Sequence, residues 1–269
     1  MTPADTFDLP ECLAPISPAR PCGDNLEYDS EYALLQTRLA PQMDVQYGDF
    51  TLRPDSPDWA DIERECRRLL LRAKDISLLI WLTRCRARRN GATGLCEGLN
   101  LLWLALRQYP LDIHPQKHID GQTDPIVRAN ALAALNDSEG LLADVRDLVI
   151  VPAAAARLTV RDVERALLPP RQADALPAES VQAQLTDLYH HGQSERLALA
   201  RSLALVRGIR DWSREDLGDD APDLGPLLRL LDKFGPPPAT DTLNAPPPPA
   251  DLSPTPQASP SPPTPPGKL

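Results

Sequence analysis

The sequence predicts a mainly α-helical protein, and three observations support this prediction. Apolar residues make up 42% of the 269 residues but aromatic residues only 4%, so the core must consist mainly of Leu, Ala, Ile and Val. Such a composition is typical of helical cores. Apolar positions recur at helical spacing along most of the chain. The connections between these segments are short, which favours antiparallel helical hairpins or a bundle.

The charge and hydropathy of the chain exclude two classes of partner. A formal net charge of −10 repels nucleic acid, so no nucleic-acid partner is expected. No window holds the roughly 18 apolar residues that cross a bilayer, and no basic segment followed by an apolar run begins the sequence. We therefore expect a cytoplasmic protein without direct membrane insertion.

Composition and pattern divide the chain into four regions. Residues 1–168 are the predicted main helical domain, 169–179 a Pro-marked linker, and 180–235 a smaller helical region that either forms a second domain or packs on the first. Residues 236–269 contain 14 prolines and no aromatic residue. This composition is typical of a disordered tail or linker.

The first two helices are predicted from their starting residues. Asp29 or Ser30 can cap a helix in which Tyr32, Leu35 and Leu39 follow at helical spacing. The next helix is predicted to begin at the dipeptide 56–57, with Ser56 as the cap, Pro57 at the first helical position, and an apolar stripe that includes Trp59 and Cys66.

Asp75 then caps a helix that ends in the arginine-rich stretch "RCRARR". The glycines of "NGATG", residues 90–94, turn the chain into a further helix that Pro110 closes. Two short helices follow, and a minor β-hairpin is predicted near residues 149–160. Thr159 and Asp162 resemble the entry to a short helix. The later helical patterns cover Ser180 to His190, Glu195 to Trp212 and Leu224 to Phe234.

The sequence contains no recognisable catalytic, cofactor or metal motif. There is no GxSxG elbow, no phosphate-binding loop and no GxGxxG. His114 and His118 have a metal-ligand spacing, but Pro115 interrupts a helix through both and no HExxH glutamate is present. Five cysteines without a CxxC pair predict no disulfide framework or zinc ribbon, and Cys66 and Cys85 are predicted core residues. We expect no enzyme, no cofactor and no metal site.

The stretch "PCGDNLEYDSEY", residues 21–32, has the acidic content of a metal loop. Its spacing fails the EF-hand pattern. If Asp24 is position 1 of the loop, position 3 is Leu26, which cannot bind a cation, and position 6 is not a glycine. The acids are better explained as helix-start residues and solvated surface.

The predicted binding surface is basic. Arg84, Arg86, Arg88 and Arg89 crowd one helix end, and residues 61–90 hold nine Lys or Arg against four Asp or Glu. Such an asymmetry in an acidic protein can bind an acidic partner surface. The alternative is a solvated helix face with intrahelical pairs.

An ordered series of fragments resembles the ImpA N-terminal family, which is carried by TssA proteins of the bacterial type VI secretion system. The series covers about residues 13–150. The fragments are "PISP..PCGDNLEYDSEY" at 15–32, "QYGD" at 46–49, "PDW" at 57–59, "LLLRAKDISLLIWLTR" at 69–84, "GATGLCEGLNLL" at 91–102, "QYPLDIHP" at 108–115 and "DPIVRANALAAL" at 124–135.

The resemblance implies a helical, non-catalytic assembly protein that associates with the baseplate, the sheath and inner tube, and the membrane complex. Family members often oligomerise through C-terminal rings, whereas only the Pro-rich tail follows Phe234 here, so homo-oligomerisation stays open. The alternative is a stand-alone adaptor with a Pro-rich tail. We interpret the matching motif residues as turns, caps and buried anchors: Gly23, Trp59, Asp75, Gly94, His114, Pro115, Arg128 and Asn130.

Overall fold

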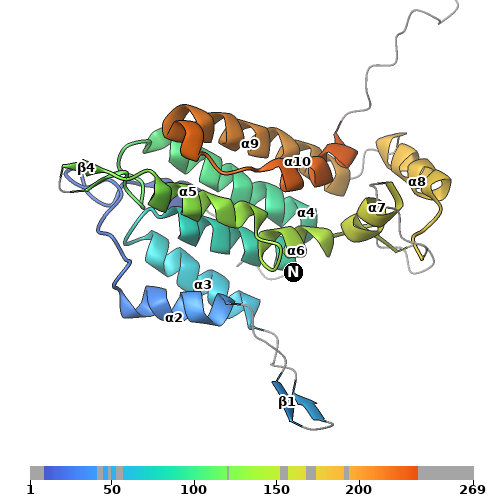
Figure 1. Cartoon of the computed structure of the whole chain (residues 1–269), viewed down its shortest axis with the longest axis horizontal. Helices are drawn as coiled ribbons and strands as arrows, with labels where there is room; N and C mark the ends of the chain where they lie inside the picture. Colours follow the sequence, from blue (N-terminus) through green and yellow to red (C-terminus); the bar gives the residue numbers. More distant parts are fainter. Residues whose placement is uncertain are drawn as a thin grey trace, which may run out of the picture. The chain divides into compact units, whose positions relative to one another are not determined.

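The computed structural model confirms a mainly helical fold. It describes residues 9–40, 45–47, 50–52, 57–119, 121–151, 157–167, 174–190 and 194–235. The described residues up to Gly235 belong to one compact unit (Figure 1). None of the described helices combines the length and apolar composition that a bilayer crossing requires. The predicted Pro-rich tail lies outside the described residues.

The connections between successive elements range from none, between α5 and η2, to residues 14–29, between α1 and α2. The α-helices are α1 (Leu9–Leu13), α2 (Ser30–Leu39), α3 (Trp59–Leu70), α4 (Ile76–Gln108), α5 (Ile126–Ala133), α6 (Leu141–Arg146), α7 (Val160–Leu167), α8 (Ala178–His190), α9 (Ser194–Leu217) and α10 (Gly225–Leu231). Short 3-10 helices are η2 (Ala134–Asn136), η3 (Gly218–Asp220) and η4 (Asp232–Phe234). Antiparallel strand pairs are β1 (Val45–Tyr47) with β2 (Phe50–Leu52), β3 (His118–Ile119) with β4 (Gln122–Thr123), and β5 (Val149–Val151) with β6 (Leu158–Thr159).

Helix α4 forms the centre of the core as a hairpin of two halves. Gly91 interrupts it with φ 62° and ψ −144°, a conformation that disfavours any residue with a Cβ. The halves then pack closely, because a Cβ at Gly98 would lie 2.6 Å from atoms of Thr83. The predicted turn at "NGATG" is therefore confirmed at Gly91. Asp75 caps the helix as predicted, its Oδ1 accepting a hydrogen bond from the N–H of Leu78 at 3.0 Å.

Helix α3 begins two residues later than the sequence predicted. Asp58 is its cap, because Oδ1 of Asp58 accepts hydrogen bonds from the N–H groups of Ala60 and Asp61 at 3.0 and 3.1 Å. Pro57 therefore precedes the helix, and Ser56 lies outside the described residues. Helices α3 and α9 both pack on α4 and lie on opposite sides of it in Figure 1.

The helices of the smaller region predicted at 180–235 pack against two different parts of the protein. Helix α9 packs along α4, where Gly208 leaves room for the Trp103 ring, and α10 covers α9. Helix α8 packs with α7 instead. Most of this region therefore contributes to the same core as α4.

The predicted hairpin near residues 149–160 is present as β5 and β6, with Val149 opposite Thr159 and Val151 opposite Leu158. The predicted helix entry follows it directly. The Thr159 N–H donates to Oδ2 of Asp162 at 2.9 Å, and the Asp162 N–H donates to Oγ1 of Thr159 at 3.2 Å. This reciprocal pair is a capping box at the start of α7.

Candidate functional site

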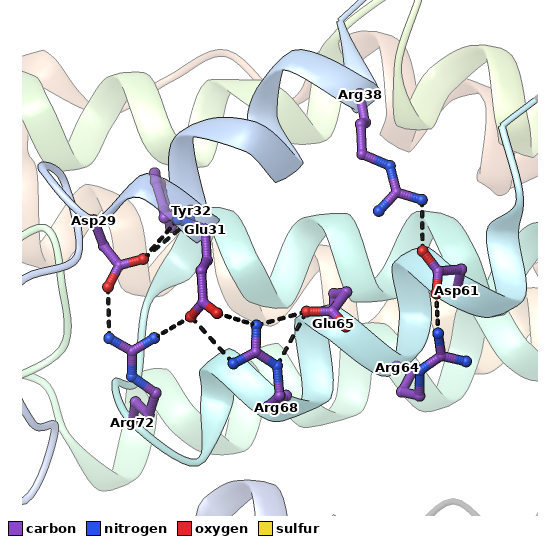
Figure 2. Close-up of polar contacts among 9 residues, drawn as sticks. All are labelled: Asp29, Glu31, Tyr32, Arg38, Asp61, Arg64, Glu65, Arg68 and Arg72. Carbon is purple, nitrogen blue, oxygen red and sulfur yellow. Dashed lines mark hydrogen bonds and ion pairs between the residues drawn. The ribbon is translucent and has the colours of Figure 1, made fainter.

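The acidic start of α2 faces an arginine stripe on α3 (Figure 2). Arg72 Nη2 donates to Oδ2 of Asp29 at 2.5 Å, and its Nη1 donates to Oε2 of Glu31 at 2.7 Å. Arg68 reaches Glu31 at 2.9 Å and Glu65 at 2.7 Å. Arg68 lies in the last turn of α3, and Arg72 lies in the turn that follows its C-cap Leu71. Asp29 and Glu31, two of the four acids of the stretch 21–32, are thus joined to α3 and to the turn that follows it.

A second group of charges lies further along the same two helices. Arg38 near the end of α2 donates to Oδ2 of Asp61 at 2.7 Å, and Arg64 binds the other carboxylate oxygen of Asp61 (Figure 2). We call the two groups together the α2–α3 charged network. Its members are Asp29, Glu31, Arg38, Asp61, Arg64, Glu65, Arg68 and Arg72.

The arginines keep the network ionised. Hydrogen bonds from Arg72, Arg68 and Arg38 lower the pKa values of Asp29, Glu31 and Asp61, respectively. All of these side chains keep some contact with solvent, so each pair contributes only modestly to stability. The network neutralises its own charges and leaves no isolated carboxylate cluster for a cation.

Three large apolar side chains are exposed around this network. Tyr28 is 94% exposed immediately before α2, Leu34 is 62% exposed on α2, and Leu71 is 47% exposed at the end of α3. The ion pair of Asp29 with Arg72 brings the chain segments of Tyr28 and Leu71 together. A shallow groove between α2 and α3 is lined by Leu34 as well as by network residues. Apolar anchors with a charged rim are typical of a protein-binding surface.

The predicted basic surface is not a single exposed surface. Arg84 and Arg86 are buried. Arg84 Nε donates to Oδ2 of Asp144 at 2.7 Å, and Arg88 pairs with the other oxygen of this fully buried carboxylate. Both guanidinium groups also stack on the Trp59 ring, with the Arg88 group 4.5 Å from its centroid.

Glu63 of α3 holds the remaining members of the cluster. Arg86 Nη1 lies 3.2 Å from Oε1 of Glu63, and Arg86 also pairs with Glu97. Arg89 pairs with the second oxygen of Glu63. The expectation of one partner surface is therefore corrected for Arg84 and Arg86, whose charges join helices inside the protein. Partner binding by Arg88 and Arg89, which retain some exposure, stays a prediction.

The two histidines with metal-ligand spacing have separate partners. His114 is buried, and its Nε2 lies 3.2 Å from the Gly23 carbonyl oxygen. Burial lowers the pKa of His114, which favours the neutral imidazole. His118 Nδ1 lies 2.8 Å from Oγ1 of Thr123. Among the described residues, no group of three or more His, Cys, Asp or Glu side chains is placed to hold a metal ion.

Most of the motif residues are structural anchors, as interpreted from the sequence. Arg128 is fully buried and donates to the carbonyl oxygens of Pro110, Ile113 and Pro115, each at 2.8 or 2.9 Å. It also pairs with Asp216 of α9 at 3.1 Å. Asn130, in contrast, is exposed.

Asp75 is the most strongly perturbed carboxyl among the described residues. Burial raises its pKa to about 7, although the N–H groups of Leu78 and Ser77 and the Tyr32 side chain contact it. The Tyr32 ring packs on Trp81 at 5.0 Å between centroids. Asp75 and Tyr32 thus join α2 to the start of α4.

The helical body, its internal polar anchors and its exposed apolar side chains define a compact helical module with an apolar surface beside the α2–α3 charged network. Residues 13–137 match the sequence model of the family described as ImpA, N-terminal, type VI secretion system. This match confirms the resemblance to the ImpA N-terminal family that the sequence showed.

Two relatives extend the comparison beyond the family region. The chain is 29% identical over 254 residues to the type VI secretion system component TssA1 of Pseudomonas aeruginosa, an alignment that covers 88% of this chain and 72% of that protein. A solved N-terminal domain including the conserved ImpA_N region of the TssA component from Burkholderia cenocepacia has a TM-score of 0.60 and 23% identity. That match covers 84% of this chain and 90% of the other, and it shows a common fold.

Proposed function

We propose that this protein is a non-catalytic assembly component of a type VI secretion system. The observation that carries the proposal is the family region at residues 13–137, whose motif residues form the turns, caps and anchors of the body. The relative from Pseudomonas aeruginosa, named as a component of this secretion system, supports the same role. In this role the helical body positions surfaces for other subunits and performs no chemistry.

The surface that binds these subunits is the exposed apolar set around the α2–α3 charged network. Tyr28 and Leu34 provide side chains that a partner can bury, and truncation of such anchors often removes much of the binding energy. The paired charges around them provide a rim that fixes the orientation of the partner. The partner is a subunit of the baseplate, of the sheath or tube, or of the membrane complex.

The test uses the purified full-length chain and each purified baseplate, sheath, tube and membrane-complex subunit of the same secretion system. Tyr28→Ala and Leu34→Ala should weaken the binding of at least one subunit by about tenfold. Leu111→Ala is the matched control, because Leu111 is 69% exposed outside the α2–α3 surface. A wild-type chain that binds none of these subunits, together with normal secretion in a deletion strain, would favour the adaptor alternative.

Oligomerisation requires a separate measurement. Size-exclusion chromatography with light scattering on the full chain gives its mass in solution, and the same measurement on a chain ending at Gly235 tests the contribution of residues 236–269. A homo-oligomer would present the α2–α3 surface in several copies, which strengthens binding without any new contact.

A further inference from the structure

A second surface lies on the other side of the core from the α2–α3 network. A groove of about 690 Å³ runs between the second half of α4 and the first half of α9. Its lining is mainly apolar and includes Cys96, Ala198, Ala204 and Leu205, together with the charged Glu97 and Arg201. Leu197 on its rim is exposed.

The two walls are helices that run in the same direction. Trp103 contacts Gly208, and about two turns earlier on both helices the Cys96 thiol lies beside the Ser202 hydroxyl. Ala204, between these two contacts, and Ala198, one turn before Ser202, have small side chains that leave the space between the walls open. Two side-by-side helices with an apolar floor accept a third helix, whose side chains pack into the groove. The α9 wall from 194 to 205 is about three helical turns long.

The charges on the rim are unequal. Arg86 holds the carboxylate of Glu97 on the α4 wall. On the α9 wall, Arg201 is exposed and has no ion-pair partner within the part of the chain that the structure describes. Among the described residues of the groove, Arg201 is therefore an unpaired cation beside an apolar floor, in a chain whose net charge is −10.

We propose that this groove binds an amphipathic helix of about three turns from another secretion-system subunit. The apolar face of that helix packs against Cys96, Ala198 and Leu205, and a carboxylate on its edge pairs with Arg201. The proposal rests on the proposed function, because the partner is one of the subunits named there. A partner is favoured over a second copy of this chain, since two chains of charge −10 repel each other.

The test measures binding of the full chain to each purified subunit of the same secretion system and maps the contact by hydrogen exchange. Ala204→Trp fills the groove from its exposed rim, and Arg201→Glu reverses the unpaired charge. Arg214→Glu makes the same charge change on an exposed position of α9 outside the groove, and Ala183→Trp places the same bulk on the exposed face of α8. Thermal unfolding of all variants confirms that each is folded.

We expect one subunit to slow hydrogen exchange at residues 93–100 and 194–205. Both groove variants should bind that subunit about tenfold more weakly or worse than wild type, and both controls should change its affinity by less than about twofold. Mutation of one acidic residue on the partner helix to Lys should restore binding to Arg201→Glu.

Three results would overturn the inference. If a subunit binds wild type, both groove variants and both controls equally well, the groove is not its binding site, and the proposed function stays intact. Light scattering that shows a dimer of the wild type and a monomer of Ala204→Trp would assign the groove to a second copy. If no subunit binds the wild-type chain, both the proposed function and the role of the groove are wrong.

Discussion

Asp29 and Arg72 join the start of α2 to the turn that follows α3 through a 2.5 Å ion pair between Oδ2 and Nη2. The other oxygen of the same carboxylate accepts hydrogen bonds from the N–H groups of Glu31 and Tyr32 and so caps α2. One side chain therefore fixes both where α2 begins and where it packs. The segment that resembled a metal loop is a joint between two helices.

These two roles of Asp29 can be separated by mutation. Asp29→Asn keeps a cap acceptor but loses the charge, whereas Asp29→Ala loses both. We expect the urea midpoint of unfolding to fall slightly for Asp29→Asn and further for Asp29→Ala. In an Arg72→Ala background, the Asp29→Asn change should have little further effect, because the ion pair is already absent. Equal midpoints for the Asn and Ala variants would show that the cap contributes nothing.

Removal of the buried Asp144 carboxylate should lower the free energy of unfolding far more than removal of an exposed carboxylate. Asp144→Ala leaves the buried Arg84 guanidinium without its partner, and removal of one member of a buried pair costs about 3–5 kcal/mol. Asp147→Ala breaks the exposed pair with Arg161 and should cost about 1 kcal/mol or less. Denaturant unfolding of the two variants measures the difference. Similar losses would mean that Arg84 finds a new partner or solvent.

Two glycines with positive φ should respond differently to alanine. Gly91→Ala adds a Cβ with no atom within 4 Å, so it costs only backbone strain, about 1–3 kcal/mol. Gly23→Ala has the same kind of strain, and its Cβ would also lie 2.0 Å from the Arg72 carbonyl oxygen. The Gly23 variant should therefore have the lower unfolding temperature. The opposite order would indicate that the loop before α2 moves away from α3 at little cost.

Sequence periodicity predicted the helices because their buried stripes are local. The cap at Asp75 and the helix entry at Thr159 and Asp162 were also predicted, and Asp29 was one of the two caps considered for α2, since each involves residues within three positions. The hairpin of β1 and β2 was missed although its signal is present. In "VQYGDFTL" two strand-like runs flank the two-residue connection Gly-Asp, a pattern that favours a hairpin.

The candidate site could not be predicted to the same extent. Arg72 and Asp29 are 43 positions apart, and Arg84 and Asp144 are 60 positions apart. Only the packing of helices decides whether an arginine stripe faces solvent or a carboxylate of another helix. For the same reason, the sequence identified Arg84 as a surface residue, whereas Asp144 of α6 neutralises it in the interior.

Asp75 makes stability depend on pH in a direction opposite to that of an ordinary paired carboxylate. Its pKa is raised from 3.8 to about 7 in the folded protein, because ionisation would place a charge in a buried site. Between these two values the folded state binds more protons than the unfolded state. The stabilisation is fully present below pH 3.8 and is lost as pH rises toward 7. The slope cannot exceed about 1.4 kcal/mol per pH unit for one proton.

Asp75→Asn tests this directly, because Asn can still cap α4 and accept a hydrogen bond from Tyr32 but cannot ionise. Urea unfolding from pH 4.5 to 8 should show that the mutant gains stability relative to wild type as pH rises. The network acids Asp29, Glu31 and Asp61 have lowered pKa values and titrate below this range. His114, whose pKa is also lowered, is present in both proteins and cancels in the difference. A difference that stays constant with pH would mean that the Asp75 carboxyl ionises in the folded protein as readily as in water.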